Sequence, residues 1–379
     1  MNNRNPKKIM MASSVHVWSD TRIYFKEAQT LANQGFQVDF YALDHPGEKI
    51  NIPNLTMHYL KPQKRYKRFI HWRFLYKEMI QSDATYFHFH DPELLLTARA
   101  LKKKLKDEIK ITYDMHEHLP AAIRTKQWLP RIIRPILSQV VAYFEKKWMK
   151  YCDTVIFAEL SYKDNYEELT LNKVDVLNYP IFPNLNELIM KDNVFTMIYV
   201  GVLTEQRGLF NMLQLAKSVK DRGIQTFKLK LIGPIFTDEE RVQQFIVENH
   251  LSDNIELHGR MQYKDIWAHY QAAHVGLCLL HPTPNNLNSH STKLFEYMAA
   301  GLPIVASDFP DFTKMLTEHD CGKTSDPEDY DALYDIIDFY MANPEKNKQF
   351  GENGKEAFNR FYNWEREGEK LSSIYSSED

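Results

Sequence analysis

Short apolar runs alternate with helix-like patterns along the whole chain. The runs are a few residues long, are bounded by turn-forming residues, and have the length of buried strands. In the segment 208–220, between two such runs, the apolar residues fall on one helix face, namely Leu209, Met212, Leu213, Ala216 and Val219. This alternation is typical of βαβ units, so we predict an α/β protein with parallel sheets.

The strands are predicted to form two sheets. Strand candidates in the first half are 9–13, 37–42, 55–59, 85–88, 111–113, 154–157 and 174–177, and in the second half 197–201, 228–232, 255–257, 275–279, 303–306 and 321–324. The segment 178–192 is rich in Pro and Asn and lacks periodicity, so it is read as a linker. We therefore predict two Rossmann-like, doubly wound domains at 1–186 and 187–363, followed by a last helix within 364–379.

Two such domains facing each other would leave a central cleft between the carboxyl ends of their sheets. Open parallel sheets bind their ligands at those ends. Functional residues are therefore expected in the loops that follow the strands.

Charge is distributed unevenly between the two halves. Residues 1–186 carry 28 Lys and Arg against 20 Asp and Glu, a net +8, and residues 187–379 carry 19 against 30, a net −11, which together make the −3 of the whole chain. The basic half is the one expected to meet an anionic surface. With 22 Phe, 21 Tyr and 6 Trp, the chain has ample core material, which excludes disorder as its main state.

The cysteines and the longest apolar runs bear on the compartment. Cys152, Cys278 and Cys321 are widely spaced and form neither a disulfide framework nor a zinc site of the CxxC type. The chain lacks a run of about 18 apolar residues, and the apolar stretch near its start reads as a strand and not as a signal peptide. The expected location is cytoplasmic.

The segment 289–307 has the most informative pattern in the second half. It reads as a loop, a helix that Ser291 or Thr292 can cap, and a strand. A helix N-terminus attracts anions, and a cation in the first turn, Lys293, opposes the helix dipole unless it faces a phosphate. Glu296 lies on the same face and can accept hydrogen bonds from ribose hydroxyls. A plain amphipathic helix with both charges in solvent remains an alternative.

Two further loops follow strands at the same predicted edge. In 199–208 a strand ends and Arg207 opens the next helix, where it is well placed to meet an anion. In 257–261 the backbone of Arg260 and Met261 follows another strand and could contact a flat base. Each signal is weak by itself, because an Arg near a helix start is common.

Taken together, these pieces resemble the donor domain of the family 4 glycosyltransferases of GT-B fold. The matching sequences are YVGVLTEQRG at 199–208, HGRMQYKDIWAHYQAAHVGLCLL at 258–280 and KLFEYMAAGLPIVAS at 293–307. Their order and spacing match across the whole second half. The resemblance implies a GT-B fold, a nucleotide-diphosphate sugar donor, with UDP the expected nucleotide, and transfer to a hydroxyl of a glycan or lipid-linked acceptor with retention of configuration.

The resemblance also implies site residues, position by position. The implied donor-binding residues are Arg207, Arg260, Met261, Asn288, Ser291, Thr292, Lys293 and Glu296. Of these, Arg207 and Lys293 bind and stabilise the diphosphate, and Glu296 binds the ribose. The sequence departs from the family at Asn288, where many members have a first Glu, and at Val202, where many have a further cation. The last helix, 364–375, resembles the family's C-terminal helix, which crosses back onto the first domain.

In the first half, the resemblance implies one further catalytic residue. A His that follows a first-domain strand lies beside the transferred sugar in the family, and His116, in the sequence DMHEH, matches that place. A His can hydrogen-bond a sugar or tune a nearby proton. The double-Gly loop common near the first strand is replaced here by SSVH at 13–16. Structural and functional roles both remain open for four other polar residues, His16, Asp20, Arg22 and His90.

Neither a metal nor a cofactor is expected. The loops lack a paired-carboxylate DxD motif in a suitable place. The resemblance implies that the two cations and the helix end take the place of a metal ion as stabilisers of the leaving diphosphate.

Basic and aromatic residues are interleaved from Lys61 to Lys77. This run holds seven Lys and Arg together with two Tyr, two Phe and one Trp. Basic residues attract anionic headgroups and aromatic residues favour the membrane interface, so the run is a candidate peripheral surface for the inner face of the cell membrane. A solvated loop and helix is the alternative. Nucleic acid binds similar compositions, but it is not the partner that we expect.

Two other functions remain open on the same scaffold. A nucleotide-sugar epimerase or hydrolase would consume donor without an acceptor, and a non-catalytic protein would bind nucleoside diphosphate and release none. A nicotinamide dehydrogenase is disfavoured, because a GxGxxG motif does not follow the first strand.

Overall fold

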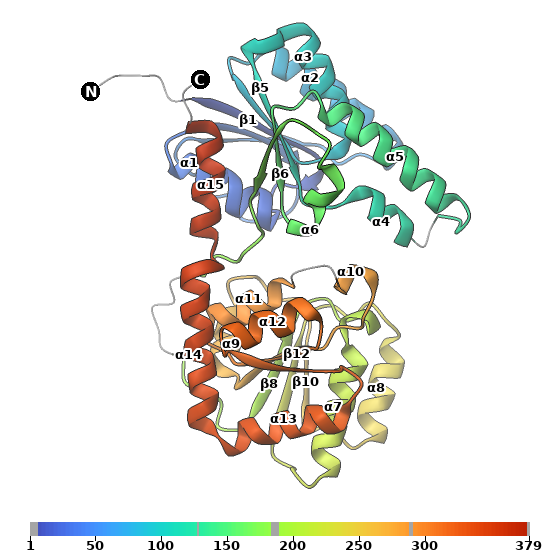
Figure 1. The fold of residues 1–379 in the computed structure, drawn as a ribbon, viewed down its shortest axis with the longest axis vertical. Helices are drawn as coiled ribbons and strands as arrows, with labels where there is room; N and C mark the ends of the chain where they lie inside the picture. Colours follow the sequence, from blue (N-terminus) through green and yellow to red (C-terminus); the bar gives the residue numbers. More distant parts are fainter. Residues whose placement is uncertain (1–6, 127–128, 183–188, 288–290, 377–379) are drawn as a thin grey trace. The chain divides into compact units, whose positions relative to one another are not determined.

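The computed structural model describes residues 7–126, 129–182, 189–287 and 291–376. The chain divides into two compact units, Met1–Asn178 with Trp364–Asp379, and Tyr179–Asn363. Each unit is built on one parallel sheet with helices packed on it (Figure 1). The two-domain α/β fold predicted from the apolar pattern is confirmed.

The first unit has a seven-stranded sheet in the order β3-β2-β1-β4-β5-β6-β7, and all neighbouring strands are parallel. Its strands are β1 (Lys8–Val17), β2 (Gln37–Leu43), β3 (Leu55–Leu60), β4 (Tyr86–Phe89), β5 (Lys110–Met115), β6 (Thr154–Phe157) and β7 (Asn172–Asp175). Its helices are α1 (Gln29–Asn33), α2 (Phe69–Gln81), α3 (Leu95–Leu105), α4 (Leu119–Thr125), α5 (Ile133–Met149), α6 (Leu160–Lys163) and α15 (Trp364–Ser376). Because β1, β4 and β5 are neighbours, the loops after them share one edge.

The second unit has a six-stranded parallel sheet in the order β10-β9-β8-β11-β12-β13. Its strands are β8 (Thr196–Val200), β9 (Lys228–Ile232), β10 (Ile255–His258), β11 (Val275–Cys278), β12 (Ile304–Ser307) and β13 (Gly322–Ser325). Its helices are α7 (Leu209–Asp221), α8 (Glu239–Glu248), α9 (Ile266–Ala272), α10 (Pro284–Leu287), α11 (Thr292–Ala299), α12 (Pro310–Glu318), α13 (Tyr330–Ala342) and α14 (Pro344–Phe361). The order places β8 and β11 side by side at the centre of the sheet. From β8 the chain adds strands toward one edge, and from β11 it adds strands toward the other.

The chain changes unit earlier than the expected boundary after residue 186. Tyr179 already packs edge-on against Phe295, with ring centroids 4.7 Å apart, and against Tyr362, at 5.5 Å. Both partners belong to the second unit, so the boundary falls after Asn178. The six residues 183–188 lie outside the described part of the chain.

Helix α15 packs on the first unit. The indole of Trp364 donates a hydrogen bond to Thr30 Oγ1 at 2.8 Å, and the carboxylate of Glu367 accepts one from the Leu177 amide at 2.7 Å. These two bonds tie the last helix to segments from the start and the end of the first unit.

The first helix after β1 begins as a π-helix, η1 (Thr21–Ala28). Asp20 caps it, because Oδ1 accepts hydrogen bonds from the amides of Arg22 and Ile23. The wider turn of a π-helix brings residues five apart onto one face. Arg22 and Glu27 therefore both point into the core.

Two further findings concern the cysteines and the longest helices. Cys152, Cys278 and Cys321 are all buried and unbonded to one another. Within the described residues, the helices are all too short or too polar to cross a membrane.

Candidate functional site

Close packing of backbone shapes the loop after β8. Gly208 has a left-handed backbone, with φ of 77°, and a Cβ there would lie 1.8 Å from the carbonyl oxygen of Leu279. Only glycine fits, so the start of α7 lies directly against the segment that follows β11. Arg207 comes just before this glycine, at the end of a short 3-10 turn that Thr204 caps. The close approach holds the exposed Arg207 at the carboxyl end of the sheet.

Lys293 and Glu296 form an ion pair in the first turns of α11. Lys293 Nζ lies 2.6 Å from Glu296 Oε2, and the hydroxyl of Tyr270 donates to the same oxygen at 2.7 Å. The side chains of Lys293 and Glu296 are 17% and 6% exposed. Burial and the Glu296 charge raise the pKa of Tyr270 far above its usual range, so this phenol remains a donor. Tyr270, which α9 contributes, was not among the site residues predicted from the sequence.

Arg207 precedes and Lys293 follows a residue that packs on the end of β11. Gly208 lies against the carbonyl of Leu279, and the Ser291 hydroxyl accepts a hydrogen bond from the buried Cys278 thiol. Burial raises the pKa of Cys278 to about 11, while Ser291, Lys293 and Arg207 act in the opposite direction. Burial likewise raises the pKa of Tyr199 to about 12, against the influence of Arg207. The loops that hold the two predicted diphosphate ligands thus meet at the end of β11.

The start of α11 differs from the prediction in one respect. Ser291 is the N-cap residue, but its side chain does not cap the helix. Its hydroxyl instead accepts a hydrogen bond from the Cys278 thiol at 3.5 Å. Ser291 thus occupies the N-cap position, but its side chain does not cap the helix, because β11 offers this side chain another partner. Thr292 is the first residue of the helix.

Arg260 and Met261, which were also predicted to bind the donor, lie further out along the edge of the sheet than Arg207. Arg260 is exposed and Met261 half-buried, in the loop after β10. This edge strand is separated from β8 by β9, so the loop lies at the same edge of the sheet as Arg207 but further out. Asn288 lies outside the described residues.

In the first unit, His116 faces a second histidine across the ends of β5 and β1. The Nε2 atoms of His116 and His16 are 3.0 Å apart. Nδ1 of His116 lies 3.5 Å from Asp114 Oδ2, and Nδ1 of His16 lies 3.5 Å from Asp20 Oδ2. Among the described residues, the buried Nδ1 of His116 makes no hydrogen bond, whereas Nε2 of His16 also lies 3.6 Å from Asp91 Oδ1. Both nitrogens of His16 thus face acceptors, which favours the imidazolium form.

These contacts predict the titration of His16. Burial lowers its pKa, but Asp20, Asp91 and Glu117 outweigh burial and raise it above the ordinary 6.5. The protonated His16 ring therefore stabilises the fold fully below pH 6.5, and this stabilisation is lost as the pH rises through the raised pKa of His16. We expect Asp20→Asn to lower the His16 pKa in ¹⁵N NMR titrations. Asp44→Asn, an exposed change in the loop after β2, is the control that leaves it unchanged. A wild-type value at or below 6.5 would contradict the prediction.

Beneath His116 lies a buried ion-pair network. Arg22 donates to both oxygens of Asp114, at 2.9 and 2.7 Å, and its Nε lies 2.9 Å from Glu27 Oε1. Although burial opposes it, the Arg22 guanidinium and the rings of His116 and His90 hold the pKa of Asp114 well below its usual range. Burial and the Asp114 charge raise the pKa of Glu27. Asp114 thereby orients His116, and Arg22 holds Asp114.

Two groups in the first unit have donor atoms within 4.8 Å of one another, close enough for a metal ion: Glu27, His88 and His90, and His90, Asp114 and His116. The rings of His88 and His90 are stacked, with centroids 4.5 Å apart and planes 22° apart. A ring nitrogen offers its lone pair in the ring plane, so two stacked rings direct their lone pairs side by side and not toward one ion. In the other group, Asp114 already binds Arg22 with both oxygens. We read both groups as parts of the ion-pair network.

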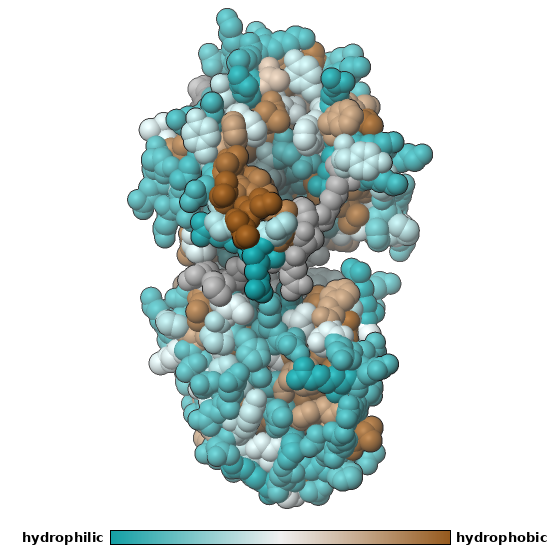
Figure 2. Space-filling view, turned by 90° about the vertical axis from the view of Figure 1, so that its right-hand side faces the viewer, coloured by the Kyte–Doolittle hydropathy of each residue, from teal (hydrophilic) through white to brown (hydrophobic). Residues whose placement is uncertain are grey.

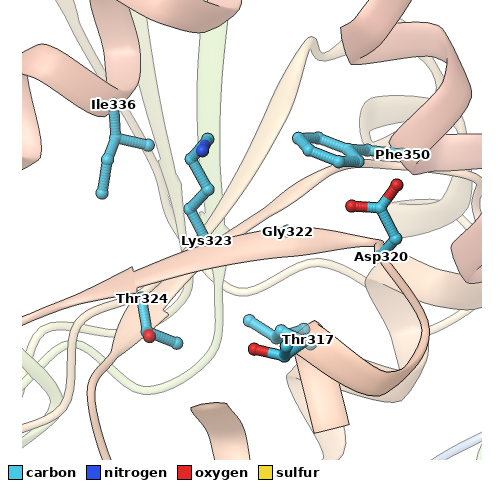
Figure 3. Close-up of a pocket in the computed structure, with 8 residues that line it drawn as sticks. Thr317, Asp320, Gly322, Lys323, Thr324, Ile336 and Phe350 are labelled. Atoms are coloured by element: carbon cyan, nitrogen blue, oxygen red, sulfur yellow. The ribbon is translucent and has the colours of Figure 1, made fainter. Parts of the chain in front are cut away.

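A separate hollow lies along the edge strand β13 (Figure 3). It has a volume of about 380 Å³ and is lined by Leu316, Thr317, Asp320, Gly322, Lys323, Thr324, Ile336 and Phe350. These residues do not include any of the predicted site residues, so the hollow is separate from the candidate site.

Family models match both halves of the chain. The model described as Glycosyltransferase Family 4 matches residues 22–180, and the model described as Glycosyl transferases group 1 matches residues 184–357. A curated relative from Methanocaldococcus jannaschii, named an uncharacterized glycosyltransferase, is 24% identical over 228 residues. That match covers 59% of this chain, and the chain spans 59% of the length of that relative.

Solved structures share the fold over nearly the whole chain. A glycosyltransferase from Rickettsia africae has a TM-score of 0.72 and 13% identity, with 98% of both chains covered. The Anabaena protein HepE, solved in complex with UDP-glucose, has a TM-score of 0.67 and 12% identity, with 98% of this chain and 100% of that chain covered. At these identities, the likeness concerns the fold.

Proposed function

Because the chain belongs to the family 4 glycosyltransferases of GT-B fold, we propose that it transfers a sugar from a UDP-sugar to a hydroxyl of a glycan or lipid-linked acceptor. The observation that carries this proposal is that the loops holding Arg207 and Lys293 both pack on the end of β11, through Gly208 against Leu279 and through Ser291 with Cys278. Two cations and a helix N-terminus suit a diphosphate. That HepE was solved with UDP-glucose supports the choice of nucleotide.

The proposed reaction breaks the bond between the anomeric carbon and the diphosphate oxygen and forms one to the acceptor oxygen. Negative charge grows on the leaving diphosphate, and Arg207, Lys293 and the amides at the start of α11 stabilise it. In this proposal the acceptor proton passes to the leaving phosphate, and configuration is retained without a metal ion or further cofactor. His116 contacts the sugar or the acceptor. Arg260 and Met261 face the base, and Asn288, Ser291 and Thr292 complete the donor site.

A donor panel tests the proposal. We expect UDP-sugars to raise the melting temperature more than GDP- or ADP-sugars, because ligands that bind the native state stabilise it. With the best donor, NMR of the product should show a new glycosidic bond that keeps the donor's anomeric configuration, formed only when acceptor is present. Consumption of donor at the same rate without acceptor would refute transfer.

Glu296 provides a second test, directed at the ribose. A hydrogen bond to a charged group contributes about 1.5–3 kcal/mol, so Glu296→Ala should weaken UDP binding by roughly 10- to 100-fold. Calorimetry with UDP and with its 2′- and 3′-deoxy analogues separates this role from an effect on Lys293. Wild type should lose affinity for at least one deoxy analogue, whereas Glu296→Ala should bind UDP and that analogue alike. Equal losses in both proteins would exclude Glu296 as the ribose ligand.

The run from Lys61 to Lys77 remains our proposal for a surface that meets an anionic membrane on its cytoplasmic face. Part of it forms α2, which exposes Phe69, Ile70 and Phe74 between basic residues. Such a surface would bring the enzyme to a lipid-linked acceptor.

A further inference from the structure

Helix α5 turns its most apolar face outward. The exposed fractions are 85% for Ile132, 50% for Ile133, 63% for Ile136, 45% for Val140, 61% for Tyr143 and 39% for Phe144. Ile132, Ile136, Val140 and Tyr143 are spaced by three or four residues and so form one continuous stripe. Brown, apolar atoms gather on this side of the first unit in Figure 2. We name these six residues the α5 stripe.

Specific contacts fix this orientation of the helix. The inward face holds Ser138, whose hydroxyl donates to the carbonyl of Pro120 at 2.7 Å, and Glu145, whose carboxylate accepts from the Tyr166 hydroxyl at 2.6 Å. Both side chains are buried. Rotating α5 to bury the stripe would break both bonds and move Glu145 away from its donor. The two hydrogen bonds therefore keep the stripe exposed in this fold.

An exposed apolar stripe of this size indicates a surface that another molecule covers. Burying Ile and Val side chains is favourable, and contiguous exposed apolar patches mark interaction sites. The six side chains of the α5 stripe lie between the N-cap residue Ile132 and Phe144 of one helix, whereas other exposed apolar residues, such as Ile50, Phe236 and Val247, are separated along the chain.

Charge around the stripe identifies the kind of partner. Residues 119–150 contain seven Lys and Arg and a single acidic residue, Glu145, which is buried. Helix α3 packs against both α5 and α2, so the three helices form one layer, to which α2 adds exposed aromatic residues and Arg73 and Lys77. An apolar stripe within a basic surface complements anionic phospholipid headgroups above acyl chains. A second copy of the chain would oppose cations to cations, which disfavours a dimer at this face.

We propose that the α5 stripe inserts into the interface of an anionic phospholipid bilayer and that the surrounding cations bind its headgroups. This inference does not depend on the proposed sugar transfer, since it concerns a face of the first unit remote in sequence from Arg207 and Lys293. It adds a hydrophobic anchor to the electrostatic attraction expected of the Lys61–Lys77 run. Binding should therefore require both apolar insertion and negative lipid charge.

Flotation of the full chain with lipid vesicles tests the proposal. Wild type should float with vesicles of phosphatidylcholine and phosphatidylglycerol, and much less with phosphatidylcholine alone. The triple substitution Ile132→Ser, Ile136→Ser, Val140→Ser should weaken binding to the anionic vesicles by roughly 10- to 100-fold. A matched triple, Ile50→Ser, Phe236→Ser, Val247→Ser, removes exposed apolar residues elsewhere and should float like wild type.

Other outcomes overturn the proposal. It fails if wild type does not float with anionic vesicles, if the stripe triple floats like wild type, or if binding is the same without phosphatidylglycerol. Sedimentation velocity on the same proteins detects the competing occupant: a wild-type dimer that the stripe triple abolishes would assign the stripe to a second copy. UDP binding by calorimetry should be equal in wild type and both triples. Failure of UDP binding in wild type would refute the proposed function and leave the membrane result standing.

Discussion

Replacing Lys293 by alanine is expected to lower kcat for sugar transfer about 100- to 1,000-fold, the range found when one donor that stabilises a developing negative charge is removed. Lys293 is mostly buried in the first turn of α11, and the loop before it packs on the end of β11, as the loop of Arg207 does. Its charge therefore acts on the leaving diphosphate with little screening by water. Initial rates with saturating donor and acceptor measure the effect.

Two further variants show whether the loss of kcat in Lys293→Ala comes from the missing positive charge beside the diphosphate. Lys217→Ala removes a lysine from an exposed pair with Asp221 on α7 and should leave kcat unchanged. Lys293→Ala also deprives Glu296 of its ion partner, so Lys293→Ala with Glu296→Gln should be as slow as Lys293→Ala alone. A melting temperature close to that of wild type confirms that the fold is retained. A wild-type rate for Lys293→Ala would reject its role.

Replacing Arg22 by methionine should lower the free energy of unfolding by about 3–5 kcal/mol, the usual cost of removing one partner of a buried ion pair. The change leaves the Asp114 and Glu27 carboxyls buried without their cation, at 0% exposure each. Denaturant unfolding measures the loss. Asp114→Leu added to Arg22→Met should recover part of it, because the pair is then replaced by apolar side chains.

The matched control for this prediction is an exposed pair. Lys348→Met removes a cation from an i,i+4 pair with Glu352 on α14, where both side chains are more than half exposed. Such a pair contributes about 0.3–0.5 kcal/mol, so this variant should unfold almost like wild type. If Arg22→Met were equally mild, the buried network would not stabilise the first unit.

The donor site was more predictable than the first-unit site. Arg207 and Lys293 stand in sequence motifs whose spacing matches a family, and the loops that hold them both pack on the end of β11. Asp114 left a weaker signal: it lies two residues before His116, and alternate residues of a strand share a face. The same spacing relates His88 and His90. What these side chains touch was not predictable, because Arg22 and Asp114 are 92 positions apart.

Two helices have features that the sequence did not predict. The segment after Asp20 has an ordinary helical pattern, yet it begins as a π-helix, which turns Glu27 toward Arg22. Helix α5 points Ser138 and Glu145 inward and the α5 stripe outward. There, the hydrogen bonds to Pro120 and Tyr166 outweigh the burial of local apolar side chains.

By itself, the sequence predicted the α/β class and, in the described part of the chain, thirteen strands in two sheets. The central strands are buried on both faces and are therefore short apolar runs, a property that is local, whereas the edge strands β7 and β13 are half-buried and more polar. Only the tertiary structure decided which charged side chains are buried and which apolar ones are exposed. A buried charge needs a compensating partner, and that partner comes from whichever strand or helix the fold places beside it. The positions of two residues along the chain do not show that they become such partners, because the sheet brings them together only when it forms.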